Sequence, residues 1–324
     1  MTKGFRIHKT GGPEQLIWEE LELPGPAGNE LRIRHTAVGV NFIDTYLRSG
    51  LYPLELPGRI GYEAAGIVEA IGDAVDDFAV GDRVVYFFGH AGAYAEANNV
   101  PAEQVVKLPD GIDDKTAAAS MLKGCTACYL LTHSYPVQAG DTILFHAAAG
   151  GVGILACQWA RQLGVTIIGT VGDQDKAQLA REHGCDHVIL YRDENVVERV
   201  MEITGGEGVH AAYDGVGRST FDASLDSLRI FGTLASFGNA SGPVESFAPL
   251  RLSKKSLFLT RPTLAHHIKP RERLLNITAA LFDVLRSGAV KPLIGQTYAL
   301  QDAAQAHRDL ESRKTQGSIV LLAE

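Results

Sequence analysis

The sequence predicts an α/β protein in which a doubly wound parallel sheet is joined to a second, antiparallel β domain. Residues 141 to about 261 alternate short β-branched segments with helical patterns, which is typical of parallel sheets. These segments are apolar on both faces, as strands covered by helices on two sides must be. The first 123 residues instead carry short alternating segments broken by Gly and Pro, and 324 residues suffice for two domains.

The N-terminal segments are expected to be antiparallel strands. Residues 30–40, 64–72 and 82–88 alternate in polarity, so we expect residues 1–123 to form a partly barrel-like domain. Residues 262–324 hold two helical stretches, 271–288 and 300–313, and a final apolar strand, 318–323. Their composition indicates an addition that completes the first domain, not a third domain.

Residues 124–261 are expected to form a nucleotide-binding domain. Strands at 142–147, 166–171 and 187–190 are each followed by a helical pattern, at 153–164, 173–184 and 194–203. Strand and helix alternate in this way in the units that build a doubly wound sheet.

A glycine-rich turn joins the first of these strands to its helix. Ala148, Ala149, Gly150, Gly151, Val152 and Gly153 keep the second and third glycines of G-x-G-x-x-G, with Ala148 in the first place. Alanine fits there if the turn needs no positive φ at that residue. The second glycine lets the backbone approach a pyrophosphate, the third allows close packing, and helix N–H groups near Gly151 would hold the phosphate. A strand before and a helix after the turn favour a dinucleotide site over packing alone.

The end of the second strand favours NADPH over NADH. The strand ends at Val171 and Gly172 without the acidic residue that bonds a ribose 2′-hydroxyl. Asp173 and Asp175 lie close enough to take that role, which keeps NADH open. The groups that could instead bind a 2′-phosphate are Gly172, Lys176, Tyr191 and Arg313.

Charge and composition exclude several classes of partner. The net charge is −8 and no run of like charges occurs, which argues against nucleic acid and anionic membranes. No signal peptide and no membrane span is evident, so we expect a cytosolic protein. Cys125 and Cys128 form a C-x-x-C, but no second ligand pair follows, so we expect them to be core residues on one helix.

Seven segments together resemble one enzyme family, the zeta-crystallin-like quinone oxidoreductases of the medium-chain dehydrogenase/reductase superfamily. They span nearly the whole chain in the family's order: HKTGGPEQL, GVNFIDTYLRSGLYP, GYEAAGIVEAIG, GDRVVYF, LFHAAAGGVG, YDGVGRSTFDASLDSLRIFGTLASFGNASG and ESRKTQGSIVL. The resemblance implies a Rossmann domain with a GroES-like domain, and NADPH-dependent reduction of a quinone by a homodimer. Asn41 and Tyr62 stand where zinc-dependent relatives have Cys and His, so no metal is expected.

The resemblance also implies the site residues. It places a quinone site between the two domains, with Asn41, Phe42, Asp44 and Tyr46 near the nicotinamide and Tyr52 toward the substrate. Asn41 and Tyr46 could donate hydrogen bonds, whereas Asp44 is expected to orient a neighbour. Further cofactor contacts are implied at Tyr129, Phe237, Gly238, Asn239 and Arg261. The same residue types can serve a helix start and its packing. Lys123 and His146 are expected to be structural or to support residues that contact the ligands.

Two other functions remain open. A reductase of activated C=C bonds would use the same metal-free scaffold, with an enone or enoyl substrate and a proton donor such as Tyr52 or Tyr46. The family also includes lens structural proteins and RNA-binding members, although the acidic charge balance argues against RNA here.

Overall fold

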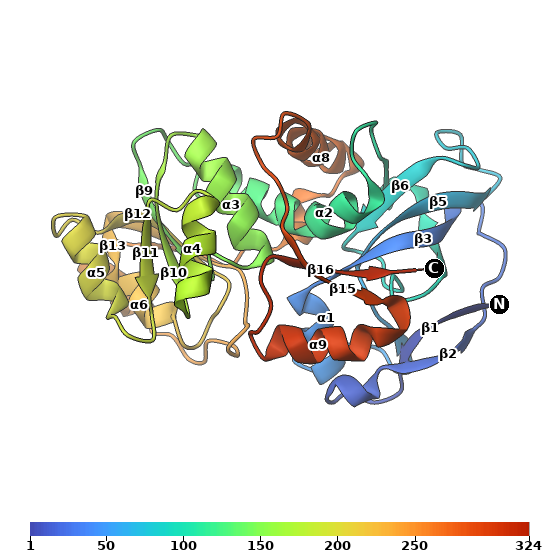
Figure 1. The fold of residues 1–324 in the computed structure, drawn as a ribbon, viewed down its shortest axis with the longest axis horizontal. Helices are drawn as coiled ribbons and strands as arrows, with labels where there is room; N and C mark the ends of the chain where they lie inside the picture. The colour runs from blue at the N-terminus through green and yellow to red at the C-terminus, as the bar shows by residue number, and fades with distance from the viewer. Residues whose placement is uncertain (324) are drawn as a thin grey trace. The chain divides into compact units, whose positions relative to one another are not determined.

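A computed structural model describes residues 1–323. They form two compact units: Met1–Lys123 with Ile268–Arg286 and the segment from Pro292 onward, and Gly124–His267 with Ser287–Lys291. The chain thus leaves the first unit after Lys123 and again after Arg286, and it returns to that unit both times (Figure 1). No helix within the described range is long and apolar enough to cross a membrane.

The first unit is built on a mainly antiparallel sheet. Its strand order is β15 (Ile294–Ala299), β16 (Ser318–Leu322), β3 (Glu30–Val40), β5 (Glu63–Ile71), β6 (Arg83–Phe87) and β8 (Val105–Lys107), with β7 (Ala97–Pro101) also on β3. A second sheet holds β2 (Ile17–Leu21), β1 (Thr2–Ile7) and β4 (Gly58–Arg59). The helices of this unit are α1 (Phe42–Ser49), α8 (Arg271–Arg286) and α9 (Ala303–Glu311), together with most of α2 (Asp114–Tyr129).

The C-terminal segment takes part in the core of the first unit. β16 pairs antiparallel with β3, with Leu321 opposite Val38. Ile319 and Ala306 belong to the same buried cluster as Ile33 of β3. Hydrogen bonds and apolar burial both link this segment to the sheet, so its removal would expose the sheet core to water. β15, which pairs parallel with β16, was not predicted.

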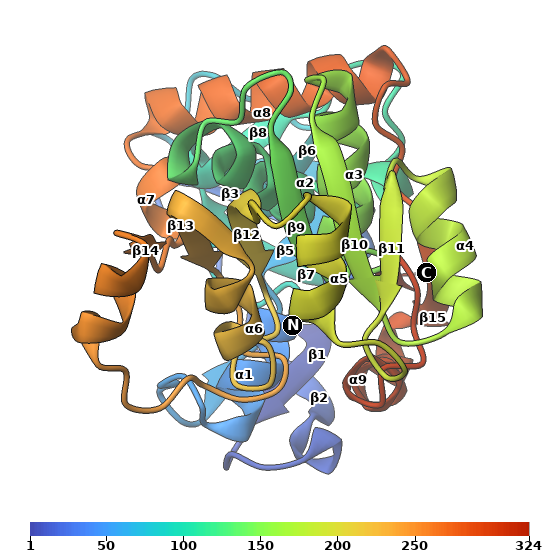
Figure 2. The same ribbon diagram turned by 90° about the vertical axis from the view of Figure 1, so that its left-hand side faces the viewer.

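The second unit is the predicted doubly wound parallel sheet. Its strand order is β11 (His187–Leu190), β10 (Thr166–Val171), β9 (Thr142–His146), β12 (Val209–Asp214), β13 (Leu228–Ser236) and β14 (Phe258–Thr260), all parallel (Figure 2). The helices α3 (Gly151–Gln162), α4 (Gln174–Glu182), α5 (Val196–Ile203) and α6 (Phe221–Asp226) pack around it, and α7 (Leu264–His267) follows β14. In chain order this sheet reads 3-2-1-4-5-6, the arrangement of dinucleotide-binding domains.

The fold class predicted from the sequence is therefore confirmed. Alternating β-branched and helical segments gave parallel strands because each helix returns the chain to the same end of the sheet. All four cysteines are buried free thiols, and Cys125 and Cys128 lie together on α2 as predicted.

Candidate functional site

The turn from β9 into α3 places its strained residue one position before the fingerprint. Ala147 has φ +55°, whereas Ala148 is not among the residues with positive φ. The Ala148 N–H donates to the Thr170 carbonyl at 3.1 Å, and the Gly150 N–H donates to the Ala147 carbonyl at 2.9 Å. Alanine is tolerated in the first fingerprint place because the left-handed residue of the turn is its neighbour.

Space for the Ala148 methyl group comes from the adjacent strand. A Cβ built on Gly169 of β10 would lie 2.7 Å from the Ala148 Cβ and 2.6 Å from the Cys185 sulfur. The Ala148 side chain and the glycine at 169 therefore fit each other. Sequence reasoning did not connect them, because only strand pairing brings them together.

The two remaining fingerprint glycines differ in what surrounds them. A Cβ on Gly153 would lie 2.5 Å from the Ala147 oxygen and 2.7 Å from both the Cα and the oxygen of Ala148. A Cβ on Gly150 would meet only the Ala147 oxygen, at 3.2 Å. Gly153 is thus required by packing, while Gly150 leaves room for a group from outside. Gly150 is also the N-cap of α3, which begins at Gly151 and Val152, so free N–H groups lie beside that space.

Polar groups gather where β10 and β11 end. A Cβ on Gly172 would lie 2.8 Å from the Tyr191 hydroxyl and 3.5 Å from the Arg192 Nε. Asp173 caps α4 by accepting from the Lys176 N–H at 2.9 Å, and the Lys176 ammonium lies 3.8 Å from its second oxygen. This carboxylate is therefore already bonded to its own helix. The arrangement can receive a phosphate, a charged group that arginine and lysine bind well.

Arg192 is a residue that sequence reasoning missed in this cluster. It directly follows Tyr191, so its position after the third strand was the available signal. Arg313, predicted for the same cluster, belongs to the other unit, where it follows α9 with φ +60°. Its role in the cluster stays a prediction.

The segment after β13 packs on the turn after β12. A Cβ on Gly215 would lie 2.8 Å from the Phe237 ring, and one on Gly238 would lie 2.3 Å from the Gly215 oxygen. Asn239 continues this segment, and its carbonyl accepts from the Gly242 N–H at 2.9 Å. Both segments lie at carboxyl ends of parallel strands, where doubly wound sheets bind ligands.

A buried polar network fixes these strand ends. Asp214 accepts from the Val216 and Gly217 N–H groups and from the Ser224 hydroxyl. His146 lies 3.0 Å from the Ser224 oxygen and 2.9 Å from the Thr170 oxygen. Burial lowers the pKa of His146, and the Asp214 carboxylate opposes that effect. The expectation that His146 is structural agrees with this position.

Tyr129 and Arg261 are held by contacts within the second unit. The Tyr129 ring stacks on His267, with centroids 4.3 Å apart and planes at 4°. Burial raises the pKa of the Tyr129 hydroxyl, and Arg261 opposes the shift. Arg261 donates to the Ser236 carbonyl at 2.8 Å, at the end of β13. Their predicted contacts with a cofactor stay predictions.

Helix α1 and the residues at its two ends hold the candidate residues of the first unit. The rings of Phe42 and Tyr46 have centroids 6.1 Å apart, and those of Tyr46 and Tyr52 lie 5.3 Å apart in an edge-to-face arrangement. The structure therefore groups three of the five predicted residues as one aromatic row. Tyr46 is 9% exposed, while Phe42 and Tyr52 are half-buried.

Asn41 and Asp44 organise the start of α1. The Asn41 N–H donates to Asp44 Oδ2 at 2.9 Å, and the Asp44 N–H donates to the Asn41 carbonyl at 3.0 Å. The Asn41 side-chain Nδ2 donates to Glu63 Oε2 at 2.9 Å. The donor that the sequence suggested for a substrate is thus engaged by Glu63, which sequence reasoning missed.

Glu63 forms a buried ion pair with Lys123. Its Oε2 lies 3.2 Å from the Lys123 ammonium, and its Oε1 accepts from the Leu122 N–H at 2.6 Å. Gly39 leaves the space for this carboxylate, since a Cβ there would lie 2.1 Å from Glu63 Oε2. The donors around Glu63 compensate for the burial of its charge. The structural role expected for Lys123 fits this pair.

Asp44 is a buried carboxyl group of the first unit whose ionisation is perturbed. Its carboxyl is fully buried, Oδ2 accepts from Asn41 and from the Tyr94 hydroxyl at 3.1 Å, and Oδ1 has no hydrogen-bond partner. Burial raises its pKa to about 7. A perturbed, incompletely bonded carboxyl beside the predicted residues is a feature of functional sites.

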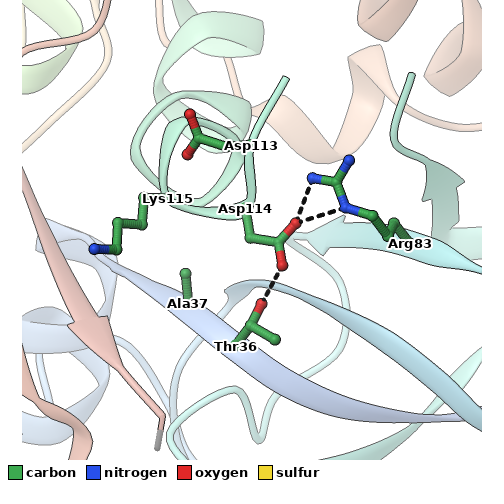
Figure 3. A pocket seen from close by; sticks show the side chains of 6 residues that line it. All are labelled: Thr36, Ala37, Arg83, Asp113, Asp114 and Lys115. Atoms are coloured by element: carbon green, nitrogen blue, oxygen red, sulfur yellow. Dashed lines mark hydrogen bonds and ion pairs between the residues drawn. The ribbon is translucent and has the colours of Figure 1, made fainter. Parts of the chain in front are cut away.

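The first unit also has a surface hollow that is lined by none of the predicted site residues. Figure 3 shows its lining residues, among which Asp114 bonds to Arg83 at 2.6 Å and to the Thr36 hydroxyl at 2.6 Å. Both carboxylate oxygens are used. Residues 1–323 contain no cluster of three or more His, Cys, Asp or Glu that could hold a metal ion.

Comparisons with known proteins cover nearly the whole chain. Residues 27–110 match the alcohol dehydrogenase GroES-like domain, and residues 151–275 match the zinc-binding dehydrogenase family. The chain is 50% identical to a quinone oxidoreductase of Salmonella typhimurium, over 99% of this chain and 100% of that protein. It is 44% identical to a 2-haloacrylate reductase of a Burkholderia species, over 98% of both chains.

A solved structure agrees with the sequence relatives. Escherichia coli quinone oxidoreductase complexed with NADPH superimposes with a TM-score of 0.97 at 48% identity, covering 99% of each chain. The similarity includes both units and therefore both groups of candidate residues.

Proposed function

Since the chain belongs to the quinone oxidoreductase family of the medium-chain dehydrogenase/reductase superfamily, we propose that it reduces a quinone with NADPH and without a metal. The observation that carries this function is identity of about half the residues with quinone oxidoreductases over 99% of the chain. The glycine turn and the polar cluster after β10 fit the cofactor independently of that similarity.

Bound NADPH would supply the hydride from its nicotinamide. The pyrophosphate would lie over Gly150, whose open side admits it, with the N–H groups of Gly151 and Val152 as donors. Gly172, Tyr191, Lys176 and Arg192 would surround the 2′-phosphate. Arg313 is assigned to the same phosphate by the resemblance alone.

The acceptor contacts are assigned to the first unit. The Phe42, Tyr46 and Tyr52 row offers an aromatic surface for a flat quinone, and the tyrosine hydroxyls offer donors for its oxygens. Asn41, with its amide nitrogen held by Glu63, would present its carbonyl oxygen or position α1. Neither Asn41 nor Tyr62 can replace the Cys and His of zinc-dependent relatives, so metal-free hydride transfer suits these residues.

Reduction of an activated C=C bond is the second candidate function. The similarity to a 2-haloacrylate reductase favours it specifically. Hydride addition to a carbon requires a proton for the neighbouring carbon. Tyr52→Phe and Tyr46→Phe are expected to reduce enone turnover more than quinone turnover, and equal losses on both substrates would remove these hydroxyls as donors.

The deciding experiment measures initial rates of NADPH oxidation with an ortho-quinone and with a small enone, using NADH as the control cofactor. Quinone reduction with a preference for NADPH supports the first function, whereas turnover restricted to the enone supports the second. Turnover of neither would contradict both. Arg192→Ala tests the phosphate cluster separately, because it is expected to weaken NADPH at least tenfold more than NADH.

A homodimer in the cytoplasm is proposed as the working form. β14 is the edge strand of the parallel sheet, and Phe258 is 61% exposed. Ile230 and Phe231 of the neighbouring strand β13 are also exposed, at 62% and 64%. An exposed apolar edge is a surface that pairing with a second copy would cover. Phe258→Asp is expected to yield a monomer in light scattering after size exclusion; an unchanged mass would exclude this edge.

A further inference from the structure

A line of buried side chains runs from Asp44 to helix α9. The Tyr94 hydroxyl lies 3.1 Å from Asp44 Oδ2 and 2.9 Å from His307 Nε2. His307 Nδ1 lies 3.1 Å from Arg48. Tyr94 and His307 are fully buried, and Arg48 is 2% exposed. The functions described above use none of these three residues.

The far end of the line is fixed in orientation. Arg48 donates to both carboxylate oxygens of Glu311, at 3.0 and 2.6 Å, and to the Gly11 carbonyl at 3.1 Å. A paired guanidinium of this kind holds its plane, because both N–H groups must point at one carboxylate. The Arg48 Nη1 atom carries a second N–H, and this N–H points to His307 Nδ1.

This anchor determines the direction of every hydrogen bond in the line. Arginine only donates, so His307 Nδ1 must accept. Burial lowers the pKa of His307 to about 3, so the ring is neutral and its single N–H is on Nε2. That N–H donates to the Tyr94 oxygen, and the Tyr94 hydroxyl is left to donate to Asp44 Oδ2.

The two oxygens of Asp44 are consequently different. Oδ2 receives hydrogens from both Tyr94 and Asn41, whereas Oδ1 is out of reach of solvent and has no partner. A buried carboxylate oxygen without a donor is costly, and protonation lowers that cost because it removes the buried charge. Since hydrogens already approach Oδ2, a proton bound by this carboxyl must be on Oδ1.

The surrounding charges oppose each other at Asp44. Lys123 on α2 favours the ionised form, Glu63 on β5 disfavours it, and the Tyr62 hydroxyl lies within range of the carboxyl's charge. Burial exceeds these contributions and places the pKa of Asp44 at about 7. The unpaired Oδ1 atom and the raised pKa therefore both favour a protonated Asp44.

We propose that Asp44 holds an exchangeable proton on Oδ1 at neutral pH, and that Tyr94 and His307 are positioning residues that direct the proton to that oxygen and limit how tightly the carboxyl holds it. The use of this proton rests on the proposed function. Hydride delivery gives a quinone two electrons and leaves one oxygen as an anion. The Asp44 O–H bond breaks, the proton goes to that oxygen, and water later returns a proton to Asp44. Oδ1 is closed to solvent here, so the proton leaves only when the start of α1 shifts or water enters.

The test observes the carboxyl directly. Infrared spectra of the full-length enzyme, recorded from pH 5 to pH 9 without cofactor, are expected to show one buried carboxylic C=O band that disappears with a midpoint near pH 7. Asp44→Asn must remove this band. A band that remains in Asp44→Asn, or no titrating band in the wild type, overturns the proposal.

Variants of the line test the positioning roles. Tyr94→Phe removes one donor to the ionised carboxyl and is expected to raise the midpoint by about 1 to 2 pH units. Tyr86→Phe is the matched control, because Tyr86 is equally buried and its hydroxyl bonds to His35 and Asn98 instead. Equal midpoints in the two variants overturn the role of Tyr94.

His307 variants keep the proposal testable if Tyr94→Phe does not fold. His307→Gln can still accept from Arg48 and donate to Tyr94, so its midpoint is expected to stay at the wild-type value. His307→Leu can do neither, and its midpoint is expected to rise; the same midpoint in both variants contradicts the role of His307. The pH profile of kcat for quinone should move with the infrared midpoint, while the Kd for NADPH stays constant.

Quinone turnover separates this inference from the proposed function. Normal turnover in an enzyme whose Asp44 does not titrate overturns the inference alone. A titrating Asp44 in an enzyme that reduces no quinone supports the assigned proton and contradicts the proposed function.

Discussion

The two glycines of the β9–α3 turn predict opposite effects for the same substitution. In Gly153→Ala, the new Cβ lies 2.5 Å from the Ala147 oxygen, roughly 0.9 Å short of an ordinary contact. The atoms in its way are backbone, so relief requires α3 to move from β9. Overpacking of this kind costs about 1–3 kcal/mol, of which the helix preference of alanine returns at most about 1 kcal/mol.

Gly150→Ala provides the matched control. Gly150 has φ −85° and ψ 172°, a conformation open to any residue, and its new Cβ meets only one oxygen at 3.2 Å. The free energy of unfolding is expected to stay unchanged or to rise by up to about 1 kcal/mol, because alanine leaves the unfolded chain fewer conformations than glycine. The same Cβ occupies the side proposed for the pyrophosphate, so NADPH affinity should fall at least tenfold, or about 1.4 kcal/mol.

The assay pairs thermal unfolding of the cofactor-free protein with NADPH titration by nicotinamide fluorescence. Gly153→Ala should lower the unfolding midpoint by several degrees, and Gly150→Ala should lower affinity without lowering the midpoint. Equal losses of stability in both variants would refute the division into a packing glycine and a ligand glycine. Normal NADPH binding by Gly150→Ala would refute the proposed position of the pyrophosphate.

Four further predictions concern other parts of the structure. Gly169→Ala should destabilise the protein by about 1–3 kcal/mol, and adding Ala148→Gly should recover part of this; strictly additive effects in a double-mutant cycle would show that the two sites do not interact. Lys176→Ala should weaken NADPH far more than NADH, and equal weakening would remove Lys176 from the phosphate cluster. Because the pKa of Asp44 is raised to about 7, the folded state binds more protons than the unfolded state between about pH 4 and pH 7, so this group's contribution to stability falls as pH rises through that range. Denaturant unfolding from pH 5 to pH 8 should therefore show Asp44→Asn gaining stability relative to wild type, and a constant difference would contradict the raised pKa. The contribution of His307 to stability has the opposite pH dependence, because the pKa of this residue is lowered. That contribution is lost as pH falls below about 6.5, so the stability of His307→Gln should depend less on acid than that of the wild type.

Local patterns in the sequence determined the fold class and the glycine turn. Residues 142–162 contain a β-branched strand, a glycine-rich turn and a helix in one continuous stretch. Backbone preference and side-chain period depend on neighbouring residues, so such a unit can be recognised without knowing what packs on it. The absence of an acid at Gly172 was equally local, and it led to NADPH, the cofactor in the complex of a relative 48% identical to this chain.

Tertiary packing decided what each candidate residue can do. The positive φ is on Ala147 because the turn must meet β10, and the Ala148 methyl fits because Gly169 lies beside it. Tyr94 and His307 are 213 positions apart, yet together they orient the carboxyl of Asp44. Burial and hydrogen-bond partners depend on segments that are distant in the chain, and a pKa depends on both. The sequence therefore determined which residues and which cofactor to expect, while only the packed structure decided which donors are engaged and which oxygen is left to carry a proton.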